Sequence, residues 1–391
     1  MPNMYDVDDI VDLKNRKKRR KRLIKILVFL LVAAILFTLY ATKDIWYPKL
    51  RGIGKQYKTI NNSGQLATGN FPIEFSEDTG YQLRYTVKRI MVQSDTYLYI
   101  YDTDGNLLKK RQHIYTNPIL RVANGKALVY ENGGNEFTLE DEEEVFYSKT
   151  FDNKILFARV SSDGYVAVVT LAENFSCELT VYNKKGKEIY NRKCTEMVTD
   201  ISFVSKSKGC MMSTLTADKG KLVTRIRRIN FDSEEDLWAS EVIRTAGLEV
   251  FGSAAGAFVY GTDMCGYVDD EGQLCTTYKY DGELAAAASI GGNSAVLINN
   301  DDSRRYIAVL FASPTSEPLT IELETKAIDV SVFKGLAYIM TQDSVLAYDF
   351  DGSLRSTASI SDSYTGFVRS DDHVFLKGYN GIDRIDYDAG D

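Results

Sequence analysis

Hydrophobic residues follow two different patterns along this chain. Over the 19 residues from Leu23 to Ala41 they form an almost continuous run, in which Lys25 is the single charged residue. A helix of that length, at about 1.5 Å per residue, reaches roughly 28 Å, which is close to the hydrocarbon thickness of a bilayer. The run therefore predicts a membrane-spanning helix over residues 23–41.

A cluster of cations precedes this helix and predicts its orientation, because positive charge gathers on the cytoplasmic side of a spanning helix. The cluster contains Lys17, Lys18, Arg19, Arg20, Lys21 and Arg22. We expect a single-pass protein of the cell membrane, with a cytoplasmic basic tail over 1–22, a linker over 42–62 and an extracytoplasmic domain over 63–391. A cleaved signal peptide is the alternative, but it needs small residues before the cut, and Leu39-Tyr40-Ala41 fits that requirement poorly.

Beyond residue 62 the pattern changes to short runs of β-branched and aromatic residues between turn signals, which is typical of an all-β domain. Four segments share one plan: a strand, an acidic or polar turn ending in glycine, and a second strand. Their turn glycines are Gly105, Gly186, Gly272 and Gly352. Glycine suits this place because the return of a tight hairpin uses positive φ, which other residues adopt at a cost.

Each of these hairpins follows two more strand-like runs, so that a four-strand unit repeats about every forty residues. The units fall near 71–111, 119–150, 154–196, 199–243, 248–282, 284–323 and 326–360. This period predicts a β-propeller, with an array of β-sandwiches as the competing architecture. The last stretch offers three strands, Gly366–Arg369, His373–Lys377 and Ile382–Tyr387, and an early strand at Phe71–Phe75 is free to complete it. We expect eight blades closed in this way, with seven as the alternative.

A polybasic tail, one anchor helix and repeats of the form Tyr-Asp-x-x-Gly-x-Leu look like a family of bacterial membrane-anchored propellers of unassigned function. The repeats are also similar to those of quinoprotein-type propellers and of the outer-membrane assembly lipoprotein scaffold. Quinoprotein repeats usually carry a tryptophan after the glycine turn, which docks one blade on the next. Tyr190 and Trp238 are the nearest counterparts here, so the resemblance implies the fold and not the quinone cofactor.

Charge divides the chain in the same way as hydrophobicity. Residues 1–51 hold 12 Lys/Arg and 5 Asp/Glu, a net charge of +7, whereas the remaining residues hold 35 and 49, a net charge of −14. An acidic domain repels nucleic acid, anionic wall polymers and lipid headgroups. We therefore expect protein partners, or cationic and neutral ligands, outside the cytoplasm, and no nucleic acid.

The five cysteines are too few for a disulfide scaffold, but four of them bracket two hairpins. If the turns are 184–187 and 269–271, Cys177 lies opposite Cys194, and Cys265 lies opposite Cys275. Opposed residues of an antiparallel pair are close enough for a disulfide. Two disulfides or four buried thiols are the open alternatives, and Cys210 is expected to remain unpaired.

Motifs of catalysis and cofactor binding are not readable in the chain. There is no phosphate loop, dinucleotide fingerprint, nucleophile elbow or zinc-ligand spacing, so we expect no catalytic residue, no metal and no cofactor. Acid pairs such as Asp102/Asp104 and Asp269/Asp270 are interpreted as turn formers, the run 140–144 as a solvated hairpin tip, and His113 and His373 as surface residues.

Together these observations favour a non-catalytic binding or assembly scaffold. The alternative is an extracytoplasmic enzyme that acts on glycans or a redox cofactor in the propeller channel, because residues that line such a channel come from many blades and leave no local motif.

Overall fold

The computed structural model describes residues 60–62, 70–75, 80–204, 207–370 and 373–386. The chain divides into two compact units, Met1–Lys58 and Thr59–Asp391, and all described residues belong to the second. The predicted tail and the predicted membrane helix lie outside the described residues. Within the described ranges, no helix has both the length and the apolar character needed to cross a bilayer.

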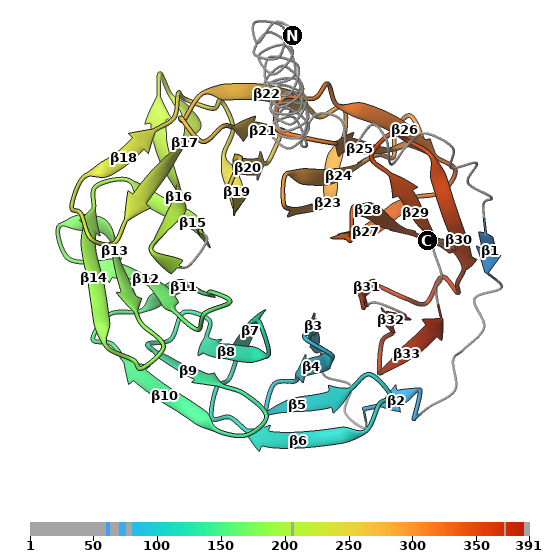
Figure 1. Cartoon of the computed structure of the whole chain (residues 1–391), viewed down its shortest axis with the longest axis horizontal. Coiled ribbons are helices and arrows are strands. Elements are labelled where there is room, and N and C mark those ends of the chain that lie inside the picture. The colour runs from blue at the N-terminus through green and yellow to red at the C-terminus, as the bar shows by residue number, and fades with distance from the viewer. Residues whose placement is uncertain (1–59, 63–69, 76–79, 205–206, 371–372, 387–391) are drawn as a thin grey trace, which may run out of the picture. The chain divides into compact units, whose positions relative to one another are not determined.

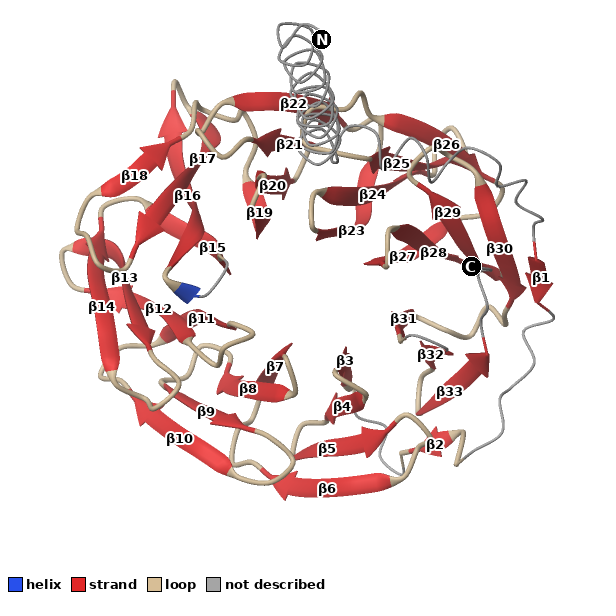
Figure 2. Ribbon diagram, viewed as in Figure 1, coloured by secondary structure: helices blue, strands red, loops and turns tan. Residues whose placement is uncertain are grey.

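Eight sheets are arranged in a ring in the described part of the chain (Figures 1 and 2). Seven of them contain four strands and one contains five, and in six of them the strands are four consecutive ones. Blade 1 contains β3 (Gln82–Thr86), β4 (Arg89–Gln93), β5 (Tyr97–Asp102) and β6 (Leu107–Gln112). Blade 2 contains β7 (Pro118–Ala123), β8 (Lys126–Glu131), β9 (Glu136–Glu140) and β10 (Val145–Thr150). Blade 3 contains β11 (Ile155–Val160), β12 (Val166–Ala172), β13 (Phe175–Tyr182) and β14 (Glu188–Cys194).

The next three blades follow the same antiparallel plan. Blade 4 contains β15 (Met197–Phe203), β16 (Gly209–Asp218), β17 (Lys221–Asn230) and β18 (Asp236–Ala239). Blade 5 contains β19 (Gly247–Ser253), β20 (Gly256–Gly261), β21 (Met264–Val268) and β22 (Leu274–Lys279). Blade 6 contains β23 (Glu283–Ile290), β24 (Asn293–Asn300), β25 (Arg305–Phe311) and β26 (Leu319–Leu323). In every blade the first strand lies nearest the axis (Figure 1).

The last two blades hold the ends of the propeller. Blade 7 contains β27 (Ala327–Phe333), β28 (Leu336–Thr341), β29 (Ser344–Asp349) and β30 (Leu354–Ser359). Blade 8 contains β31 (Gly366–Arg369), β32 (His373–Lys377) and β33 (Gly381–Asp386), and its fourth strand is β2 (Ile73–Glu74) from the start of the domain. The prediction of an eight-bladed β-propeller is thus confirmed, and seven blades are excluded.

The ring closes where the first and last parts of the domain meet. Strand β2 pairs antiparallel with β33, with Ile73 opposite Ile382, and Figure 1 shows the blue strand against the red one. The Tyr81 hydroxyl adds hydrogen bonds to the carbonyls of Gly378 and Gly381, at 2.9 and 2.7 Å. The predicted closure of the last blade by the early strand is therefore confirmed. An additional strand, β1 (Ile60–Asn62), pairs in parallel with β30 and lies within the stretch that we expected to be a linker.

The hydrophobic core is a series of layers between neighbouring blades. In β24, Val296 and Ile298 pack toward the aromatic residues of blade 5, whereas Ala295 and Leu297 pack toward blade 7. Alternate residues of a strand point to opposite faces of its sheet. A middle strand with both faces covered is therefore apolar at nearly every position, and this explains the continuous runs in the sequence.

The turn glycines dock one blade on the next. Gly272, with φ of +90°, lies beneath the indole of Trp238 from blade 4, and a Cβ there would stand 2.9 Å from that ring. Gly186, with φ of +73°, lies against the Tyr147 ring of blade 2 in the same way. Trp238, one of the two counterparts named from the sequence, thus performs the docking between blades 4 and 5. Between blades 2 and 3 that place is taken by Tyr147, whereas Tyr190, the other expected counterpart, packs in a buried cluster with Phe231.

Replacing Gly272 with alanine is expected to lower the free energy of unfolding by about 2–3 kcal/mol, because the new Cβ combines positive-φ strain with a clash against Trp238. Gly220→Ala is the matched control, because its φ is +78° and no atom lies within 4 Å of the added Cβ. That control is expected to cost about 1 kcal/mol. Equal losses in urea unfolding would show that the indole does not dock there.

Candidate functional site

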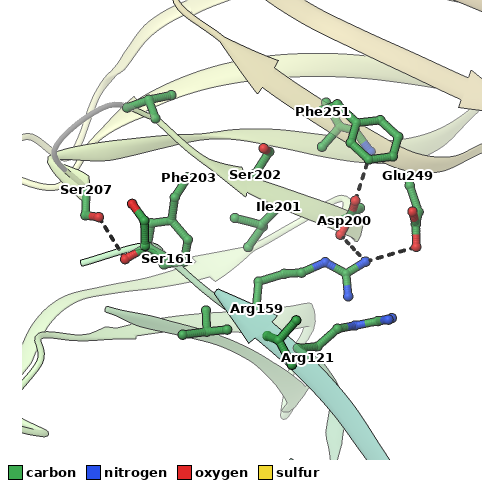
Figure 3. A pocket seen from close by; sticks show the side chains of 15 residues that line it. Arg121, Arg159, Ser161, Asp200, Ile201, Ser202, Phe203, Ser207, Glu249 and Phe251 are labelled. Carbon is green, nitrogen blue, oxygen red and sulfur yellow. Dashed lines mark hydrogen bonds and ion pairs between the residues drawn. The ribbon is translucent and has the colours of Figure 1, made fainter. Parts of the chain in front are cut away.

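A cavity of about 470 Å³ lies at the axis among the first strands of blades 2 to 5 (Figure 3). Its wall combines charged side chains with an apolar part and two turns that carry serines. The charged residues are Arg121, Arg159, Asp200 and Glu249; the apolar ones include Ile201, Phe203, Val250 and Phe251; the serines are Ser161, Ser162, Ser202 and Ser207.

Local irregularity of the first strands places carboxylates at the axis. The pairing of β15 with β16 shifts between Val198 and Asp200, that of β19 with β20 between Gly247 and Glu249, and that of β27 with β28 before Asp329. A β-bulge adds one unpaired residue and turns the following side chain. In blades 4, 5 and 7 the residue that resumes the pairing is an acid.

Two of these carboxylates join their blade to the next one. Asp200 Oδ2 accepts a hydrogen bond from the Val250 N–H of blade 5 at 2.8 Å, and Asp329 Oδ2 accepts one from the Phe367 N–H of blade 8 at 3.1 Å. Both side chains thereby give an acceptor to a backbone donor at the edge of a neighbouring sheet. A carboxylate acceptor makes such a bond stronger than a neutral one.

Blades 1, 2 and 3, which precede the first of these acidic blades, each carry an arginine on the first strand. Arg84 lies on β3, Arg121 on β7 and Arg159 on β11. Arg159 Nη2 lies 2.7 Å from Asp200 Oδ1 and 3.4 Å from Glu249 Oε1, so this guanidinium spans three blades (Figure 3). Burial, reinforced by the positive charge of Arg121, lowers the pKa of Arg84. The axis therefore has a cationic arc and an anionic arc.

Burial raises the pKa of Asp200 to about 6, against the opposing effect of Arg159. The folded protein thus retains this proton at pH values where the unfolded chain has released it. The free energy of unfolding then contains a contribution that is complete below about pH 4 and is lost as pH rises through about 6.

Replacement of Asp200 by asparagine removes this contribution while an amide oxygen still accepts from Val250. We expect the stability difference between wild type and D200N to shift in favour of D200N by about 3 kcal/mol between pH 4 and pH 7. Urea unfolding at several pH values measures it, with D362N, which changes an exposed carboxylate, as the control for net charge. A difference that stays constant over this range contradicts the assigned pKa.

The cysteine pairs differ in their outcome. Cys177 and Cys194 lie directly opposite each other, as predicted, and the hydrogen bond between their sulfurs lowers the pKa of Cys177. The expected register of the other pair is wrong. The turn extends to Gln273, whose carbonyl accepts from the Asp269 N–H, and a β-bulge follows between Tyr267 and Val268. Cys265 therefore lies opposite Tyr278, and Cys275 is exposed elsewhere on β22. The cysteines are thiols in this structure, Cys210 is buried, and the Cys177–Cys194 disulfide stays a prediction.

Each of the two histidines lies beside a carboxylate: His113 beside one of the neighbouring blade, and His373 beside one of its own blade. His113 is buried and its Nε2 lies 2.9 Å from Oε1 of Glu140, which is fully buried in β9. The predicted surface position of His113 is therefore wrong, as is the solvated position of Glu140, because the acidic run begins inside the strand. His373 is half-buried, with Nδ1 2.7 Å from Asp386 Oδ1.

The acidic turn residues act as predicted. Asp102 Oδ1 accepts from the N–H groups of Asp104 and Asn106, each at 2.9 Å, and Asp269 Oδ1 accepts from those of Glu271 and Gln273. These side chains satisfy the backbone of the turn. The topology signal, Lys17 to Arg22, lies outside the described residues.

Sequence reasoning missed the axial charges, although a signal was present. Arg84, Arg121 and Arg159 recur at intervals of 37 and 38 residues, the length of one repeat, and each follows the start of a first strand. Charges that recur with the period of a propeller and fall on its innermost strands come to lie side by side around the axis. Searching each repeat position for charge finds them.

Fold and site together define an all-β propeller with a charged axial cavity. Residues 67–386 match the model of a family of unknown function, DUF5711. The chain belongs to this family. No curated protein sequence matches it.

Solved structures share the fold at low sequence identity. BamB from Moraxella catarrhalis is 12% identical, with a TM-score of 0.53 over 82% of this chain and 99% of that one. Sqt1 from Saccharomyces cerevisiae is 7% identical, with a TM-score of 0.63 over 83% and 100% of the two chains. The dihydro-heme d1 dehydrogenase NirN is 11% identical, with a TM-score of 0.52 over 76% of each chain. These likenesses concern the fold alone.

Proposed function

We propose that this protein is a single-pass membrane protein whose propeller is a non-catalytic binding or assembly scaffold outside the cytoplasm. The observation that carries this proposal is the use of the axial carboxylates. Asp200 and Asp329 accept backbone N–H groups of the next blade, and Asp200 also pairs with Arg159. Side chains bound in this way hold the ring together and leave its outer loops to meet partners.

Other features support the location and the kind of partner. The apolar run over 23–41 follows seven consecutive cations, residues 16–22, which favours an inward N-terminus. The net charge of −14 beyond residue 51 disfavours anionic polymers as partners. The repeats resemble those of the outer-membrane assembly lipoprotein scaffold, which adds weight to a protein partner.

Site-specific photo-crosslinking in living cells tests the scaffold. Ile290, 61% exposed, lies at the end of β23, and Tyr379, 74% exposed, lies in the turn between β32 and β33. These turns join first to second strands and second to third strands, and therefore lie on opposite faces of the ring. A photoreactive residue at one position is expected to give a discrete covalent adduct, with the other position as the matched control. Absence of an adduct from both faces contradicts a scaffold that uses them.

A specific observation also favours the enzyme as a second candidate. Asp200 and Glu249 both contact Arg159 Nη2, and burial raises the pKa of Asp200. Glycosidases use two carboxyl groups whose pKa values are separated by their surroundings. If the protein is such an enzyme, the purified domain releases reducing ends from soluble glycans, and both D200N and E249Q abolish that release. The scaffold predicts no release by the wild type.

A further inference from the structure

At the axis, the arginine side chains of blades 1 to 3 outnumber the carboxylates that form ion pairs with them. Arg159 has two acidic partners, but among the described residues neither Arg84 nor Arg121 forms an ion pair. Arg84 Nη1 donates instead to the carbonyl of Leu83 at 2.9 Å. Nearby like charges repel one another more strongly in a partly buried site than in water.

Two donor atoms of this cluster also lack an acceptor. Arg121 Nε and Arg159 Nη1 are buried and have no hydrogen-bond partner in the part of the chain that the structure describes. A buried donor left unpaired costs free energy. Both side chains line the same cavity, and Figure 3 shows their guanidinium groups extended in the same direction. An oxyanion between them would satisfy the donors and reduce the repulsion.

We propose that this axial cavity binds a small organic monocarboxylate, with its carboxylate held by Arg121 and Arg159. Guanidinium groups match a carboxylate because they donate two parallel hydrogen bonds. The apolar part of the wall, with Ile201, Val250 and Phe251, accommodates an organic body, and about 470 Å³ is within the range of small-molecule sites.

The two carboxylates of the cavity determine which class of anion it can bind. Asp200 and Glu249 both reach Arg159, and their charges oppose a second negative charge on the ligand. A monocarboxylate is therefore preferred over inorganic phosphate or a polyanion. The acidic character of the whole domain acts in the same direction.

Binding in this cavity goes beyond the scaffold function and does not depend on it, because the purified protein should bind the ligand without a membrane or a partner. Titration calorimetry on the full chain in detergent tests it with three probes. Benzoate has the carboxylate and an apolar body, benzamide has the same shape without the charge, and inorganic phosphate has more charge without the body.

Saturable binding of benzoate, weaker or absent binding of benzamide and phosphate, and at least a tenfold loss of benzoate affinity in R121Q are expected. R305Q is the matched control and should bind benzoate like the wild type, because Arg305 is a half-exposed arginine of blade 6 outside the cavity. R121Q should unfold at the wild-type temperature or above, because it removes one of three clustered cations.

Three results overturn the proposal: no saturable heat with benzoate, affinity for benzamide or phosphate equal to that for benzoate, or unchanged benzoate affinity in R121Q. If R121Q fails to fold, the comparison of the three probes on the wild type still decides between the proposal and its rejection. A failure here leaves the crosslinking result untouched, so the two proposals fail separately.

Discussion

Replacement of Glu140 by glutamine is expected to destabilise the domain by about 3–5 kcal/mol. Glu140 is fully buried on β9 of blade 2, where it is ion-paired with Arg111 and its Oε1 lies 2.9 Å from His113 Nε2. Both partners come from the end of blade 1, so this carboxylate joins two blades. Glutamine leaves the Arg111 guanidinium without its counter-charge in a largely buried place, and that loss exceeds the value of any surface pair.

Glu142→Gln is the matched control because Glu142 joins the same two blades through Arg89. Oε1 of Glu142 lies 3.0 Å from Arg89 Nη2, and about a third of each side chain is exposed. An exposed pair of this kind contributes at most about 1 kcal/mol. Urea unfolding compares the two variants. Similar losses for E140Q and E142Q would mean that Glu140 is not the buried anion of this interface.

Replacement of Ile73 by aspartate should cost at least about 4 kcal/mol by opening the ring. Ile73 is 6% exposed and packs with Phe375 and Ile382 in the cluster between blades 8 and 1. Aspartate removes this apolar contact and places an unpaired charge in the layer that β2 closes. The fourth strand of blade 8 is then lost, and the edge of β33 becomes unpaired.

Glu74→Lys tests whether the loss of stability in I73D comes from opening the ring or would follow from any substitution in β2. Glu74 is the other residue of the strand and is exposed, so its side chain can change with an effect of at most about 0.5 kcal/mol. The urea midpoints of the two variants are the measurement. If I73D retains the midpoint of E74K, the early strand does not hold the ring together.

The blades were predictable because their information is local. The residues Tyr-Asp-x-x-Gly-x-Leu define a turn, an Asx hydrogen bond and the start of the next strand within seven positions. The incomplete last unit, together with the surplus strand at Phe71–Phe75, also predicted the closure. A ring with an unpaired edge is unfavourable, and this physical constraint joins segments that are some three hundred residues apart.

Other features depend on contacts that no local pattern encodes. Ile60–Asn62 has no strand alternation, yet it pairs with β30. Glu140 belongs to an acidic run that reads as exposed, but its partners Arg111 and His113 are on another blade. The partner of Cys265 lies three positions beyond the expected one, because the turn is two residues longer and a β-bulge between Tyr267 and Val268 adds one more; such shifts change every pair in a hairpin.

The axial site lies between these cases. Taken alone, each of its arginines would be predicted to be an ordinary polar residue of a strand. The cavity exists only once the first strands of four blades meet at the axis. The interval between Arg84, Arg121 and Arg159 was available in the sequence. That Arg159 has two acidic partners while Arg84 and Arg121 form no ion pair among the described residues was not. Pairing of side chains is a property of three-dimensional geometry, so the anion site required the structure.

Thiol labelling on oriented membrane vesicles tests most directly whether a folded propeller lies outside the cytoplasm. Of the five cysteines, all within the part of the chain that the structure describes, Cys275 alone is exposed. A membrane-impermeant maleimide should therefore attach one label per chain to right-side-out vesicles, and none to C275S. Labelling confined to inside-out vesicles would contradict the orientation, and several labels on the native protein would contradict the fold.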